Sequence, residues 1–216
     1  MVQKSDGKAR GRPRAYDPAQ ALRRALATFW DAGYAATSLD ELSAATGMNR
    51  PSLYGAFGDK KALYLKVLEE YRAFGRAAMA EALAPGLPLR DALRRVYRTA
   101  IDIYLSGEAG QRGCFLIGTA ATESVGDPEV RAVFAAGLHE LDDALAARFR
   151  QAVESGEIKS AIEPKLVAKL ATAVMHTLSI WARAGEKRAT LEVIAEAGVE
   201  MICGPARSRG KRRPAK

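Results

Sequence analysis

The 216-residue chain is 48% hydrophobic and 27% charged, a balance typical of globular rather than disordered proteins. It contains no run of about 18 apolar residues and no apolar segment near its start, so the sequence predicts neither a membrane span nor a secretory signal peptide. The two cysteines, Cys114 and Cys203, are too few for a disulfide scaffold and form no metal-type pair. We therefore expect a reducing compartment, the cytoplasm.

The net charge of +8 is concentrated at the two ends of the chain. Residues 1–14 carry five basic side chains and one acidic one, and residues 204–216 carry six basic side chains and no acidic one. Residues 15–203 carry 22 basic and 24 acidic side chains. Because basic tails commonly contact a polyanion, we interpret residues 1–14 as a flexible basic arm with that role. Solvated disorder is the alternative for that arm. Residues 204–216 are expected to be a disordered, solvated basic tail, with contact to a polyanion as the alternative.

The chain between the tails is predicted to be helical. Apolar residues recur at helical spacing over residues 18–30, with Asp17 as N-cap and Gly33 as the stop. Short helices follow at 38–46 and 49–57. Asp59 begins a longer helix, whose expected inner face holds Leu63, Val67, Tyr71 and Phe74. After the breakers at 85–88 we expect helices at about 89–105, 112–123, 128–154, 164–184 and 190–203.

The two short helices carry the strongest functional signal. Ser38 and Glu41 form a capping box at the start of the first, Gly47 supplies a tight turn, and Asn49 caps the second. This is a helix-turn-helix pattern, in which the second helix enters a DNA major groove about 12 Å wide. A helical hairpin in a metabolic protein is the alternative. The outward positions of the second helix are small or polar and permit that approach: Arg50, Pro51, Ser52, Gly55 and Ala56.

Residues 33–42 (GYAATSLDEL) and 46–63 (TGMNRPSLYGAFGDKKAL) resemble the tetracycline-repressor (TetR) family of bacterial transcriptional regulators. The resemblance implies an all-α homodimer of about nine helices per chain. A three-helix DNA-binding head would occupy residues 15–62, and a helical body for effector binding and dimerisation residues 63–203. It also implies a repressor that binds a pseudo-palindromic operator in double-stranded DNA and leaves it when a small molecule binds the body.

The resemblance assigns DNA contacts to individual positions. Ser38, with Thr37 beside it, matches the family's phosphate-contacting hydroxyl, although a capping role alone would also suit a hydroxyl here. Tyr54 matches the recognition-helix tyrosine that contacts the DNA backbone, with packing against Leu63 as the alternative. Lys60 matches a lysine that binds a phosphate at the start of the fourth helix.

The remaining DNA contacts fall on the recognition helix and the arm. Arg50 and Pro51 occupy positions that face bases, since arginine can bind guanine bidentately and a proline ring can touch a thymine methyl. Ser52 lies beside them. Arg12 and Arg14 flank a proline that extends the arm, so we expect them in a minor groove. Gly55 and Ala56 are smaller than many relatives have, which leaves base readout to few side chains.

The body is less informative. Small residues and apolar stripes on 164–184 and 190–203 match the family's dimer helices, with an internal core face as the alternative. The expected stripe on the first of these helices holds Leu166, Leu170, Val174, Leu178 and Trp181. By resemblance the preceding helices line an effector pocket, and its candidate residues, each also suited to a core, are Tyr97, Tyr104, Phe115, Phe134, Met175, His176 and Trp181.

The sequence favours no cofactor and no metal site. His139 has no second histidine four residues away, and Cys114 is interpreted as a buried thiol rather than a redox sensor. An enzyme would need a nucleophile with a base, a metal cluster or a phosphate loop, and none of these patterns is found. A further alternative is a DNA-binding protein controlled by a protein partner or working without an effector, which the basic C-terminal tail would suit.

Overall fold

The computed structural model describes residues 17–107, 110–158 and 163–204, and in these ranges every regular element is a helix, which confirms the all-α fold class. Both tails, and with them Arg12 and Arg14, lie outside the described residues. A π-helical segment, η1 (Leu116–Ala120), precedes α6. The α-helices within the described ranges are α1 (Pro18–Ala32), α2 (Leu39–Thr46), α3 (Arg50–Phe57), α4 (Lys60–Ala82), α5 (Leu89–Tyr104), α6 (Ala121–Glu123), α7 (Pro128–Glu154), α8 (Pro164–Arg183) and α9 (Arg188–Cys203).

Side chains cap the N-termini of the first four helices at the positions that the sequence predicts. Asp17, Asn49 and Asp59 each accept a hydrogen bond from a first-turn backbone N–H of α1, α3 and α4, at 2.7–2.9 Å. Ser38 and Glu41 form the expected capping box at α2. First-turn amides have no partner within the helix, so these oxygens both satisfy them and fix where each helix starts.

The helix expected over 112–123 is shorter and different in kind. Residues 111–114 are not helical, and the π-helical segment begins only at Leu116. Gly113 explains the delay, because its φ of +64° is incompatible with a right-handed helix and a Cβ there would lie 2.7 Å from the Ser179 carbonyl oxygen. Hydrogen bonds hold this stretch in place: the Gly113 N–H donates to the Tyr104 carbonyl at 3.0 Å and the Cys114 N–H to Ser179 Oγ at 2.7 Å.

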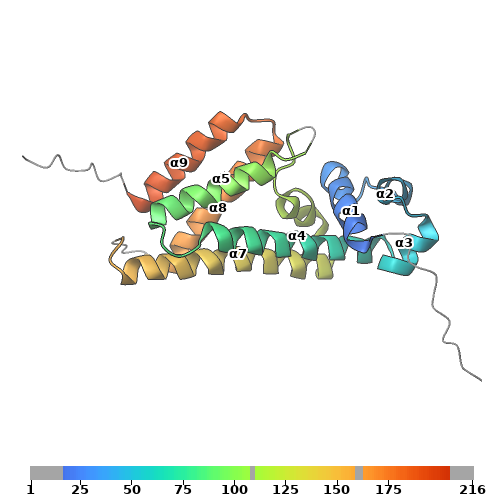
Figure 1. Ribbon diagram of the computed structural model, residues 1–216, viewed down its shortest axis with the longest axis horizontal. Coiled ribbons are helices and arrows are strands. Elements are labelled where there is room, and N and C mark those ends of the chain that lie inside the picture. Colours follow the sequence, from blue (N-terminus) through green and yellow to red (C-terminus); the bar gives the residue numbers. More distant parts are fainter. Residues whose placement is uncertain (1–16, 108–109, 159–162, 205–216) are drawn as a thin grey trace, which may run out of the picture.

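The molecule is elongated, with a small head and a larger body (Figure 1). Helices α1–α3 form the head at one end, and α4 runs from the head into the body beside α7 (Figure 1). Helices α5, α8 and α9 pack on one another to form the other side of the body. Helix α4 therefore spans both parts.

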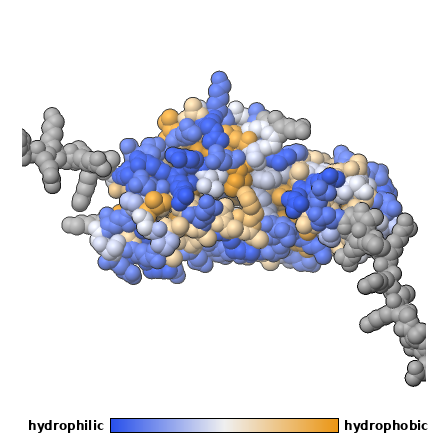
Figure 2. Space-filling view, viewed as in Figure 1, coloured by the Kyte–Doolittle hydropathy of each residue, from blue (hydrophilic) through white to orange (hydrophobic). Residues whose placement is uncertain are grey.

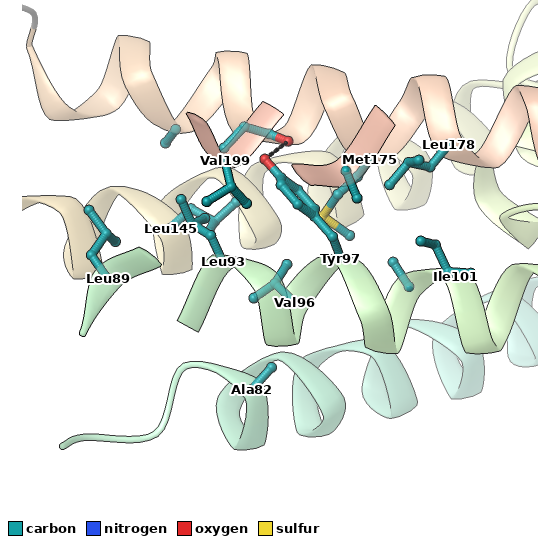
Figure 3. Close-up of a cluster of buried hydrophobic side chains, with 14 of the residues drawn as sticks. Ala82, Leu89, Leu93, Val96, Tyr97, Ile101, Leu145, Met175, Leu178 and Val199 are labelled. Atoms are coloured by element: carbon teal, nitrogen blue, oxygen red, sulfur yellow. Dashed lines mark hydrogen bonds between the residues drawn. The ribbon is translucent and has the colours of Figure 1, made fainter. Parts of the chain in front are cut away.

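Two hydrophobic cores meet along α4. The body core is built from α5, α7, α8 and α9 and includes Ala82 at the end of α4; in it the Tyr97 hydroxyl donates to the Ala171 carbonyl (Figure 3). The head core includes the first half of α4, through Tyr71, together with residues of η1. Phe74, expected on the inner face of α4, is instead 55% exposed, because neither core extends to its side of the helix.

Phe115, next to η1, joins the head to the body. Its fully buried ring lies 5.8 Å from the ring of Trp30, 5.9 Å from Tyr64 and 5.5 Å from Tyr71, measured between centroids. Polar contacts reinforce the junction: the Tyr64 hydroxyl bonds to Thr119 Oγ1 at 2.9 Å. Offset and edge-to-face aromatic pairs add to the free energy of burial, so this cluster makes the head orientation depend on the segment around η1.

We expect Phe115→Ala to lower the free energy of unfolding by about 3–5 kcal/mol, because it leaves a cavity among three aromatic rings. Phe74→Ala is the matched control, and at an exposed position it should change stability by less than about 0.5 kcal/mol. Denaturant titration followed by circular dichroism measures both. Equal unfolding midpoints for the two variants would contradict the role given to Phe115.

Candidate DNA interface and ligand cavity

The turn between α2 and α3 fixes how α3 is presented. Gly47 has a φ of +71°, in the left-handed region that side-chain-bearing residues rarely adopt. Beyond the turn, Leu53 and Phe57 of α3 are buried in the head core together with Leu42 of α2. The opposite face of α3 is therefore held outward in a defined orientation, as a recognition helix requires.

The outward face of α3 holds the residues that the sequence places at DNA. Arg50, Pro51 and Ser52 are exposed, and Tyr54 is 47% exposed. Tyr54 thus remains accessible for a contact to the DNA backbone. These four side chains come from one helix of eight residues at the end of the molecule (Figure 1).

The two hydroxyls before α2 differ in their availability. Ser38 is exposed, and its Oγ accepts from the Glu41 N–H at 3.1 Å, so the residue caps the helix at the surface. Hydrogen bonds from the Ser38 backbone and side chain lower the pKa of Glu41. Thr37 is only 1% exposed, and its hydroxyl donates to the Gly33 carbonyl at 2.6 Å. The expected phosphate contact of Thr37 is therefore not supported by its placement, because its hydroxyl serves the turn after α1.

Lys60 begins α4 on the same end of the molecule. Its Nζ lies 4.4 Å from the centroid of the Tyr34 ring, which is a cation–π contact. Asp59 caps the same helix terminus. The ammonium group is thus held beside the N-terminus of α4, where helix amides and positive charge together favour an anion such as a phosphate.

Arg50 is held by a carboxylate that the sequence reasoning missed. Its Nε donates to Asp40 Oδ1 at 2.9 Å and its Nη2 to Asp40 Oδ2 at 2.7 Å, so Asp40 of α2 grips one edge of the guanidinium. The two residues are ten positions apart and on different helices, so no short-range pattern signals the pair. The far edge of the guanidinium, formed by Nη1 and Nη2, keeps N–H donors that match the N7 and O6 acceptors of guanine.

A cavity of about 470 Å³ lies in the body, partly open to solvent. Helices α4, α5 and α7 contribute most of its lining, and Cys114, Leu116 and Met175 complete it. The lining is mainly apolar. In the space-filling view, hydrophobic surface gathers near the middle of the molecule, while both ends are mostly hydrophilic (Figure 2). Its size and character suit a small organic ligand.

Two of the seven expected pocket residues, Tyr104 and Met175, line this cavity. The other five do not, because each belongs to a different environment. Tyr97 and Phe115 are buried in the two cores, and Phe134 packs against the head core. Trp181 is 47% exposed on the outside of α8. His176 is half-buried outside the cavity lining, and burial lowers its pKa.

The cavity contains charged residues that the sequence reasoning did not assign to it. Arg72 and Arg76 of α4 both donate to the Glu140 carboxylate of α7, at 2.6 and 3.1 Å. Although burial acts in the opposite direction, these hydrogen bonds lower the pKa of Glu140. Spacing of three and four residues along α4 would place Arg72, Gly75 and Arg76 on one face, but the pairing with α7 requires the folded structure.

Several large apolar side chains remain exposed on the outside of α8 and α9. We define the α8–α9 face by Leu166, Leu170, Ile180, Trp181, Val193 and Met201, which are 45–70% exposed. Val174 is half-buried because it packs on α9, where it lies against Gly198, and Leu178 is fully buried. The stripe predicted on α8 is therefore divided between the body core and this face.

Among the helices of residues 17–107, 110–158 and 163–204, none is both long and apolar enough to cross a membrane. Burial raises the pKa of the Cys114 thiol, although the residue as a whole is only half-buried and lines the cavity.

Comparisons with known proteins match both parts of the chain. The family described as "Bacterial regulatory proteins, tetR family" matches residues 21–67, and "Tetracyclin repressor-like, C-terminal domain" matches residues 86–197. The chain is 29% identical over 215 residues to the HTH-type transcriptional repressor BdcR of Escherichia coli K12, covering 98% of this chain and 96% of BdcR. It is 30% identical over 192 residues to the repressor ComR of the same organism, covering 87% of this chain and 90% of ComR.

A solved structure of the TetR family regulator CifR, a cysteine mutant complexed with 26bp double-strand operator DNA, has a TM-score of 0.75 to this fold at 27% identity. The match covers 88% of this chain and 98% of that one. The chain therefore belongs to the TetR family, as the helix-turn-helix motif predicts. It is a DNA-binding transcriptional regulator and not an enzyme.

If Arg50 reads a base pair, we expect Asp40→Ala to weaken discrimination at that base pair by about 0.2–1 kcal/mol, the range for an exposed ion pair. Binding to unrelated DNA should rise slightly, because a negative charge near the phosphates is removed. Asp40→Asn removes the same charge but keeps one acceptor for Arg50, and should retain more of the discrimination. Selection from a randomised duplex library followed by sequencing measures these preferences. Unchanged preference in Asp40→Ala would mean that Asp40 does not position Arg50.

Proposed function

We propose that this protein is a repressor that binds a pseudo-palindromic operator as a homodimer and releases it when a small molecule enters the cavity. The observation that carries the proposal is the course of α4. Its first residue, Lys60, lies beside the recognition helix, and its second half, from Tyr71 to Ala82, lines the cavity. The repressor names of BdcR and ComR support the direction of regulation.

The proposed DNA contacts fall into two groups. Arg50 and Pro51 would read bases in the major groove, with Arg50 held by Asp40. Ser38, Ser52, Tyr54 and Lys60 would contact phosphates and set the position of the head. Arg12 and Arg14 would add positive charge from the arm, which the head needs because residues 15–62 carry five basic and five acidic side chains.

Dimerisation would use the α8–α9 face. Exposed apolar patches of this kind are rare on monomers and commonly mark interaction surfaces. A two-fold axis through the face would relate two copies of α3. To enter successive major grooves, the two helices would have to lie about 34–36 Å apart or a multiple of that spacing. An operator with two related half-sites follows from this symmetry.

Release would follow from linkage between the two sites. A ligand in the cavity would contact α4 together with Cys114 and Leu116, and these flank the Phe115 ring that packs in the head core. A ligand that favours one position of α4 therefore biases the head orientation, and DNA disfavours that ligand by the same factor. The cavity is also why a small molecule is preferred over a protein partner as the controlling signal.

Operator binding tests the core of the proposal. We expect a duplex recovered by selection to contain two related half-sites, and scrambling one of them to reduce affinity at least about tenfold at moderate salt. Fluorescence anisotropy with labelled duplexes measures the affinities. Equal affinity for operator and scrambled DNA would overturn specific recognition.

Substitutions of two valines test the assignment of the dimer interface. Val193→Glu places a charge in the α8–α9 face and should convert the dimer to monomers, because an unpaired carboxylate is costly to bury. Val125→Glu is the matched control at an 80% exposed valine outside that face, and should leave the mass unchanged. Sedimentation velocity reads both. A dimeric Val193→Glu variant would exclude this face as the interface.

A further inference from the structure

We propose that the effector is an uncharged, mainly apolar molecule carrying a hydrogen-bond acceptor, such as a carbonyl oxygen, that accepts from the Tyr104 hydroxyl. This inference rests on the proposed function, since it specifies which ligand chemistry the cavity takes. It is built from three properties of the cavity: its lining, its charges and one unpaired hydroxyl.

The lining sets the body of the ligand. Small or apolar side chains of α4 and α5 face the cavity, among them Ala78, Met79, Val96, Ala100 and Ile103. A volume of about 470 Å³ bounded by such groups gains free energy from burying apolar surface. It offers little to a strongly hydrated molecule, whose polar groups would lose water without finding partners.

Three of the four charged residues in the cavity lining, Arg72, Arg76 and Glu140, are paired with one another. Glu140 accepts from both Arg72 and Arg76, and the second Arg72 partner is Glu69, at 2.6 Å. At Arg72, whose side chain is only 10% exposed, an anionic head group would have to displace Glu140, and at Arg76, which is 48% exposed, it would have to compete with water. A cationic head group would meet two arginines, although Asp143 on the cavity lining is exposed to water and lessens that repulsion. An uncharged ligand leaves the network intact and avoids both costs.

The remaining polar groups in the lining select a hydrogen-bond acceptor. The Tyr71 hydroxyl donates to Cys114 Sγ at 3.5 Å and is therefore occupied. Tyr104 is 5% exposed and lines the same cavity, and among the described residues its hydroxyl has no hydrogen-bond partner. Burial raises the pKa of Tyr104, so the hydroxyl keeps its proton and remains a donor. The hydroxyl oxygen is not among the fully buried polar atoms that lack a partner, so it is accessible from the cavity, and a ligand oxygen placed here would accept its hydrogen bond.

The test uses four probes that share a naphthalene frame. They are 2-acetonaphthone as the neutral ketone, 2-ethylnaphthalene as the hydrocarbon without an acceptor, 2-naphthoate as the carboxylate and 2-naphthylmethylammonium as the ammonium. A second frame, a nine-carbon alkyl chain, carries the same ketone, carboxylate and ammonium groups, so that the shape of the naphthalene ring does not decide the result. Isothermal titration calorimetry with the full-length dimer measures affinity. Tyr104→Phe is compared with Tyr97→Phe, a matched control whose hydroxyl is buried and bonded to the Ala171 carbonyl outside the cavity lining.

On at least one of the two frames, we expect the ketone to bind at least about tenfold more tightly than the carboxylate and the ammonium. On the other frame, the ketone should bind no more weakly than either charged probe. Tyr104→Phe should weaken the ketone about threefold to tenfold and leave the hydrocarbon unchanged, since one neutral hydrogen bond is lost. Tyr97→Phe should change neither affinity. In the free protein Tyr97→Phe should lower the melting temperature, and Tyr104→Phe should not, because only Tyr97 has a hydrogen bond to lose.

A charge variant tests the argument on the arginines separately. Glu140→Gln leaves Arg72 and Arg76 without their shared carboxylate, so the carboxylate probe should bind more tightly than it does to the wild type, while the ketone changes little. No gain for the carboxylate would mean that ion pairing does not exclude anions from the cavity.

The proposal is overturned if either charged probe matches the ketone on both frames, if Tyr104→Phe leaves the ketone affinity unchanged, or if no ketone binds the folded dimer. Operator affinity, measured with and without saturating ketone, keeps this failure distinct from failure of the proposed function. A ketone that binds through Tyr104 but leaves operator affinity unaltered would contradict ligand-controlled release while confirming the ligand chemistry.

Discussion

The packing of the Phe115 ring among Trp30, Tyr64 and Tyr71 is the contact on which the rest of this structure depends. Trp30 belongs to α1 of the head, Tyr64 and Tyr71 belong to α4, and Phe115 immediately precedes η1. A head of three short helices has too little surface to bury on its own, so it completes its core with α4 and η1. Movement of α4 or η1 therefore cannot leave the head unaffected, and regulation of DNA binding from the body becomes physically accessible.

The electrostatic design of the head separates attraction from recognition. Residues 15–62 carry five basic and five acidic side chains, and the guanidinium of Arg50 is paired with Asp40. In the proposed complex, a head without net charge would gain little from phosphates alone, and its binding to unrelated DNA would be weak. In the same proposal, the positive charge of residues 1–14 would supply sequence-independent attraction, while the paired Arg50 would present a fixed edge for base contacts.

The cavity exists because α4 serves two cores without filling the space between them. Small residues on its second half, such as Gly75 and Ala78, approach α5 and α7 without occupying the space that large side chains would take. The ion pairs of Arg72 and Arg76 with Glu140 tie α4 to α7 across this space. A ligand that separates or draws together these helices acts directly on the element that carries Lys60 at the DNA end.

The sequence by itself determined the local elements and the family. Caps such as Asp17 and Asn49, the turn glycine and the apolar periodicities act within a few residues, so the helices and the recognition surface of α3 follow from short-range rules. Only the tertiary structure decided which aromatic residues became core, which became surface and which lined the cavity. Phe115, Trp181 and Tyr104 are all large aromatic residues, and the pairs Arg50–Asp40 and Arg72–Glu140 join separate elements. Those outcomes depend on how helices distant in the chain pack together, which no local pattern encodes.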